Sequence, residues 1–349
     1  MSYNGPLLPP ELWLQVLELL ERNDLLTLTR VTGQLRNMAL SLLWQSVTLH
    51  LKRVTAAPLP CAPHLYGFIR HITITMSDTL PFDVIEPLLT RVITEDLLPS
   101  LRSFTWACRF RLALPIYLHL RNSPTIRSLS ILYGVLRIWE LEKEAPPTCG
   151  LEHLEVHVPE LIADIFQSGS PTLNTIRSIS FPHSNVFAAI EATLRLPALR
   201  KVQFPGVISI EEAHRLLQFF MANPTIEELR FLGWCPQLPL SGLSINLLPN
   251  LTTIVDERNN TAVIPSLLWH QPLDIFSSNT KVPAPDLRRL NTTNLRIIRI
   301  TLDDTAFLAL LEGLSSIVDP LLLDRMEVNV EDASSSFKVC PAVLINMVS

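Results

Sequence analysis

Three side chains that could hold a metal ion lie at alternate positions, His153, Glu155 and His157. Alternate side chains of a β-strand point to the same face, so these imidazole and carboxylate groups could converge on one ion. The sequence offers no fourth ligand beside them, and an ordinary solvated strand face explains the same pattern. We therefore predict no metal site and no cofactor.

The other reactive groups are scattered along the chain. The cysteines are Cys61, Cys108, Cys149, Cys235 and Cys340, and none of them belongs to a CxxC pair. Glycine-rich phosphate loops and the HExxH and GxSxG motifs do not occur. Isolated thiols are typical of small buried residues in a reducing compartment. These observations predict a chain that has no catalytic residues and is not an enzyme.

The bulk composition indicates a large apolar core. Hydrophobic residues make up 48% of the 349 positions and charged residues 17%, which excludes a disordered chain. The net charge is −5 without a block of Lys or Arg, which argues against a nucleic-acid partner. No apolar run reaches the ~20 residues of a membrane span, and no signal peptide is recognisable at the N-terminus. We expect a cytoplasmic and/or nuclear protein that does not bind a membrane.

A pattern of the form apolar-x-x-apolar-x-apolar recurs along most of the chain. Successive units begin 22 to 32 residues apart, and most of the segments between them have helical periodicity. Strands at such a period, each followed by a return segment, predict a parallel sheet with helices on its other side. The units begin at Ile69, Leu101, Ile126, Leu151, Ile176, Leu199, Ile226, Leu251, Leu273, Leu295 and Leu323.

This strand motif resembles that of leucine-rich-repeat proteins. The asparagine or cysteine that the family places after the strand is mostly missing, since Arg109, Gly134, Pro159 and Ser184 stand there. The resemblance implies an α/β fold, namely an irregular leucine-rich-repeat-like solenoid over residues 65–349 with a parallel concave sheet.

The residues between the apolar positions of each unit form the expected concave surface, since they point away from the core. This surface is polar, mixed in sign and extended, which suits a protein partner better than a small molecule. The predicted target-binding residues are His153, Glu155, His157, Lys201, Gln203, Glu228, Arg230 and Arg299.

The first fifty residues have a different pattern. Leu12, Val16, Leu19 and Leu20 follow one helical face after two prolines, and two more short apolar helices follow before residue 50. We predict a three-helix module over residues 1–50 and a proline-rich linker over 51–64.

This module resembles the F-box family over about 42 residues. Two positions depart from the family pattern, because Thr32 replaces its usual cysteine and Leu35 its usual tryptophan; the smaller Leu35 could weaken adaptor docking. The matching residues, in the family's order, are Leu8-Pro9, Glu11-Leu12, Val16-Leu17, Asp24-Leu25-Leu26, Val31, Arg36, Ala39 and Leu43-Trp44.

The F-box resemblance implies docking to a Skp-type adaptor and, through it, to a cullin ligase. The chain would then be the substrate-recognition subunit of an SCF-type ubiquitin ligase, with an unknown target on the repeats. The alternative is a repeat scaffold with no ligase role, in which the same leucines only pack a helical cap onto the repeats. The matching adaptor-binding residues are Leu8, Pro9, Leu12, Val16, Leu17, Leu25, Leu28 and Val31.

Overall fold

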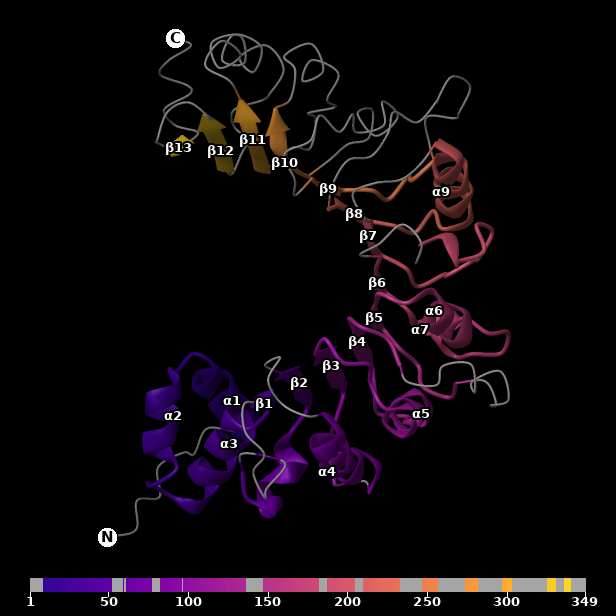
Figure 1. Ribbon diagram of the computed structural model, residues 1–349. Coiled ribbons are helices and arrows are strands. Elements are labelled where there is room, and N and C mark those ends of the chain that lie inside the picture. The colour runs from indigo at the N-terminus through magenta and orange to yellow at the C-terminus, as the bar shows by residue number, and fades with distance from the viewer. Residues whose placement is uncertain are drawn as a thin grey trace. The chain divides into compact units, whose positions relative to one another are not determined.

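The protein has an α/β fold in which strands and helices alternate along most of the chain (Figure 1). It divides into two compact units, Met1–Cys149 and Gly150–Ser349. The computed structural model describes residues 9–51, 59, 61–76, 82–95, 97–135, 147–181, 187–204, 210–232, 247–256, 274–281, 297–302, 325–330 and 336–339. This division into two units does not test the predicted modules 1–50 and 65–349. Most residues of the predicted linker 51–64 lie outside the described part of the chain.

The first unit begins with three helices, α1 (Pro10–Glu18), α2 (Arg22–Leu28) and α3 (Gly33–Leu43). Pro9 and Pro10 fit the start of α1, where a missing N–H costs nothing. The hydroxyl of Thr32 caps α3 by accepting the N–H of Leu35 at 3.3 Å. Thr32 therefore has a structural role at the position where the F-box family usually has cysteine.

Four parallel strands follow in chain order in the first unit, each hydrogen-bonded to the next. They are β1 (Ser46–Leu51), β2 (His71–Met76), β3 (Ser103–Ala107) and β4 (Ser128–Ile131). The helices of this part are η1 (Pro63–Phe68), α4 (Phe82–Thr94) and α5 (Leu114–Asn122), and α4 and α5 lie along one side of the strands (Figure 1).

Strand β1 follows the three helices at the end of the predicted module 1–50, where no strand was predicted. It pairs with β2 along its full length, from Ser46 opposite His71 to Leu51 opposite Met76. Its alternation of buried Val47 and Leu49 with exposed Thr48 and His50 is that of a half-buried strand. The helical segment thus runs directly into the sheet.

The second unit continues the same plan with eight parallel strands and a final antiparallel one. Its helices are α6 (Pro159–Ile165), α7 (Thr172–Thr175) and α9 (Ile210–Ala222), which lie on one side of the strands (Figure 1). The strands are β5 (His153–Val156), β6 (Ser178–Ser180), β7 (Lys201–Phe204), β8 (Glu228–Phe231), β9 (Thr253–Asp256), β10 (Ile275–Lys281), β11 (Ile297–Leu302), β12 (Arg325–Val330) and β13 (Ser336–Val339).

All eleven predicted strand units are confirmed, since each falls on one of the strands from β2 to β12. Their apolar residues stack in rows across the sheet, as in the register of Ile179 with Val202 and of Val202 with Leu229. A cluster of aromatic rings fills the space between β7 and α9, where Phe204 has its centroid 5.4 to 6.5 Å from those of Phe187, Phe219 and Phe220. This row packing explains why the strand motif repeats.

Asn223 joins the end of α9 to the turn that precedes β7. Its side chain is buried, and its Oδ1 accepts the N–H of Leu196 at 2.7 Å. Its Nδ2 donates to the carbonyls of Leu194 and Phe219 at 2.9 and 2.8 Å. One amide therefore satisfies three backbone groups that have little access to water.

The Asn223→Ala variant is expected to lose about 3 kcal/mol of unfolding free energy, because buried backbone groups would be left without partners. Urea unfolding followed by circular dichroism measures this loss. Asn250→Ala is the matched control, since the exposed Asn250 makes a single 3.2 Å bond to the Pro224 carbonyl. Equal and small losses in the two variants would contradict the role assigned to Asn223.

Candidate functional site

The three helices α1, α2 and α3 pack around a small apolar centre. Leu17, Leu25, Ala39 and Leu43 are buried there, and Leu28 packs partly buried against them. Leu17 is only 1% exposed and Leu25 8%. The structure thus places Leu17 and Leu25, which we predicted to contact an adaptor, in the packing between the helices, while Leu28, also predicted, remains partly exposed at its edge.

A row of apolar side chains on α1 and its C-cap residue, Leu19, faces solvent instead. Leu12 is 44% exposed, Val16 43% and Leu19 86%. Because positions i, i+4 and i+7 of a helix share one face, these three residues form a continuous strip, here called the α1 stripe. Adjacent exposed apolar side chains on one helix face are a candidate contact surface for a partner.

The remaining predicted adaptor contacts lie near the same helices. Pro9 is exposed before α1, and Val31 is 59% exposed after α2. Leu8 lies outside the described residues. Leu26 on α2, 47% exposed, was not predicted as a contact. Its sequence signal was its place next to Leu25 in the Asp-Leu-Leu segment, but sequence alone could not show which leucine points outward.

In both units, polar residues that are exposed or half-buried alternate along the strands with buried apolar residues, and we call the side they share the polar strand face. In β3, half-buried Ser103 and Thr105 alternate with buried Phe104 and Trp106. In the second unit His153, Lys201 and Arg230 are exposed, whereas Glu155, His157 and Gln203 are half-buried. Arg299 lies on β11, but its side chain is outside the described part of the structure.

Glu228 is the exception on this face, because its side chain is only 11% exposed and lies between two cations. Its Oε2 is 2.7 Å from Nζ of Lys201, and its Oε1 is 2.5 Å from Nε of Arg230. Burial alone would raise the pKa of Glu228, but the hydrogen bonds from Lys201 and Arg230 hold it below its ordinary value. The carboxylate therefore stays ionised and fixes both cations on the face.

The Glu228→Gln variant is expected to be less stable than the wild type by about 1 kcal/mol at pH 7, because two charge-assisted bonds become neutral. Since the folded pKa lies below the ordinary 4.5, this contribution is present above pH 4.5 and disappears as the pH falls through the folded value. Urea unfolding at pH 7 and pH 3 should show a stability difference that shrinks in acid. A difference that is the same at both pH values would contradict this account.

The candidate metal ligands do not gather into a binding site. His157 Nε2 lies 3.9 Å from Glu155 Oε1, and His153 is exposed. Within the residues that the structure describes, no group of three or more His, Cys, Asp or Glu side chains is placed to hold a metal ion. Glu155 and His157 therefore make only a weak polar contact on the strand face.

Two of the described thiols, Cys61 and Cys108, are poor nucleophiles. Burial raises the pKa of Cys108 to about 12, and its Sγ donates to the Ile74 carbonyl at 3.4 Å. Burial likewise raises the pKa of the partly exposed Cys61. A thiol with a raised pKa carries almost no thiolate at neutral pH.

The comparisons with known proteins add no relative. No family model matches the chain, and no curated protein matches it significantly. Among the described helices, none combines the length and apolar character needed to cross a lipid bilayer.

Proposed function

We propose that this chain is the substrate-recognition subunit of an SCF-type ubiquitin ligase. The α1 stripe docks a Skp-type adaptor, and the polar strand face holds the target protein. The chain itself catalyses nothing; it raises the effective concentration of the target beside the enzyme that carries ubiquitin.

The exposure of the α1 stripe is the observation that supports this proposal most directly. Leu12 and Val16 belong to the sequence segments that resemble the F-box, and both remain open to solvent after the three helices have packed. Burying side chains of this size stabilises a complex by up to about 1.5–3 kcal/mol each. Covering the stripe would therefore contribute favourable free energy to a complex, less than these full values because Leu12 and Val16 are already more than half buried.

A scaffold without a ligase role is the second candidate, and the junction of α3 with β1 favours it. The Gln45 carbonyl, just after α3, accepts the N–H groups of Arg70 and His71 at 2.9 Å each. The three helices thus connect without a spacer to the first strand, as expected for a cap that protects the open edge of a parallel sheet.

Reconstitution with purified components separates the two candidates. The full chain is mixed with a Skp-type adaptor, cullin and RING subunit, passed over a size-exclusion column, and then supplied with ubiquitin, E1, E2 and ATP. The ligase proposal predicts co-elution with the adaptor and ubiquitin transfer that requires the full chain. Separate elution of the chain and the adaptor would leave the scaffold as the better account.

A further inference from the structure

An arginine stands immediately before each of three neighbouring strands in the first unit, Arg70 before β2, Arg102 before β3 and Arg127 before β4. Backbone hydrogen bonds fix their register. The Arg70 carbonyl accepts the N–H groups of Arg102 and Ser103 at 2.8 and 2.9 Å, and the Arg102 carbonyl accepts those of Arg127 and Ser128 at 2.7 and 3.0 Å. The three arginines are therefore neighbours at the strand spacing of about 4.8 Å; we call them the arginine column.

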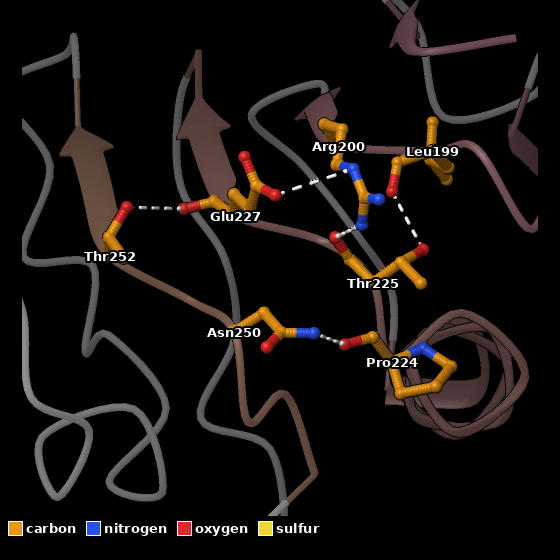
Figure 2. Close-up of polar contacts among 7 residues, drawn as sticks. All are labelled: Leu199, Arg200, Pro224, Thr225, Glu227, Asn250 and Thr252. Carbon is orange, nitrogen blue, oxygen red and sulfur yellow. Dashed lines mark hydrogen bonds and ion pairs between the residues drawn. The ribbon is translucent and has the colours of Figure 1, made fainter.

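The same structural position in the second unit carries charges of both signs. There Arg177 Nε lies 3.8 Å from Glu152 Oε2, and Arg200 Nε lies 3.3 Å from Glu227 Oε1. Figure 2 shows the second of these pairs, in which Arg200 also donates to the Thr225 carbonyl at 3.0 Å. Ion pairs across neighbouring strands thus compensate the charges at this position in the second unit.

The arginine column lacks this compensation at its first two members. Arg70 and Arg102 are exposed, and within the described residues neither guanidinium takes part in an ion pair or a side-chain hydrogen bond. Arg127 has interactions of its own, so the inference does not depend on it. Two like charges at adjacent positions repel each other, which an anion placed between them would relieve.

The neighbouring His71 reports the same positive environment. Burial lowers its pKa first, and the charges of Arg70 and Arg102 lower it further. Both guanidinium groups therefore act on the first residue of β2. The half-buried hydroxyl residues Thr73 and Ser103 lie beside it on the strand face and can add neutral hydrogen bonds.

We propose that Arg70 and Arg102 bind an acidic segment of a partner protein, with side-chain carboxylates of Asp or Glu facing the two guanidinium groups. Guanidinium matches carboxylate in a bidentate geometry. In an extended peptide, alternate side chains lie about 6.8 Å apart on one face, a spacing that two long arginine side chains at neighbouring strands reach. The inference rests on the proposed role of the strands as a target-binding surface and names the chemistry of the target.

Fluorescence anisotropy with a labelled, capped peptide of four Glu-Ser repeats tests the proposal on the full chain without any adaptor. The wild type is expected to bind this peptide, to bind less as salt is raised, and not to bind the matched Gln-Ser peptide. The Arg70→Ala, Arg102→Ala variant should bind at least about tenfold more weakly, because two charge-assisted contacts are lost.

The matched control is the Arg36→Ala, Arg91→Ala variant. It removes the same two charges from exposed sites on α3 and α4 and should bind the peptide as the wild type does. Thermal melts that coincide for both variants exclude unfolding as the cause.

Three results would overturn the proposal: no binding of the Glu-Ser peptide by the wild type, an equal loss in both variants, or binding only when the serines are phosphorylated. Because the adaptor is absent from this assay, such a failure is separate from a failure of adaptor docking.

Discussion

The Leu17→Asp variant is expected to lose the packed arrangement of α1, α2 and α3, whereas Val16→Asp should keep it. Leu17 is 1% exposed among Leu25, Ala39 and Leu43, so an aspartate there would bury a carboxylate without a partner. Such a change destabilises a fold by several kcal/mol, about 3–5 when the charge has no compensation. An aspartate in place of Val16 would keep its charge in water and should change the unfolding free energy little, because Val16 is 43% exposed.

Hydrogen exchange followed by mass spectrometry measures this difference peptide by peptide. Peptides of α1–α3 should lose protection in Leu17→Asp and keep it in Val16→Asp. Equal protection in both variants would show that Leu17 is not in the centre of the helical cluster, and the assignment of the α1 stripe as the outer face would fail with it.

The Phe204→Ala variant is expected to lose about 3–5 kcal/mol of unfolding free energy in the second unit. The Phe204 ring is fully buried and contacts Phe181, Phe187, Phe219, Phe220 and Phe231 with centroid distances of 5.4 to 6.5 Å. Alanine would leave a cavity that rigid neighbouring rings cannot fill.

Urea unfolding measures this loss, with Met221→Ala as the control. Met221 lies on the same helix as Phe219 and Phe220 but is 62% exposed, so its replacement should change stability by less than about 0.5 kcal/mol. A loss of under about 1 kcal/mol for Phe204→Ala would contradict the packing described between β7 and α9.

The strand repeat could be predicted because its signal is local. Nine of the units place three apolar residues in one short segment, and the two irregular ones that begin at Leu251 and Leu273 have a polar residue, Asp256 or Ser278, at the third position. All eleven segments are strands. β1 was missed because Val47 and Leu49 follow α3 directly and lie too close to the helices for a unit of their own to be recognised. β13 was missed because it pairs antiparallel with β12 and does not belong to the repeat.

The surface of the helical segment could be predicted only in part. Periodicity places Val16 and Leu17 on adjacent faces of α1, but it does not indicate which face α2 and α3 cover. The repeat aligns Lys201 with Glu228, but periodicity does not indicate that the Glu228 carboxylate is buried between Lys201 and Arg230. The arginine column has a sequence signal, because Arg70, Arg102 and Arg127 each directly follow the first residue of a predicted unit, but the sequence does not show which of these side chains have ion-pair partners.

Adaptor affinity is the most direct test of the central claim that the α1 stripe is a docking surface. Isothermal titration calorimetry of the purified Skp-type adaptor into the full chain is compared with the Leu12→Asp, Val16→Asp variant and with Met221→Asp as an exposed apolar control on α9. The account predicts binding by the wild type and by Met221→Asp, and at least about a hundredfold weaker binding by the stripe variant with unchanged melting. No binding by the wild type, or equal binding by all three proteins, would contradict it.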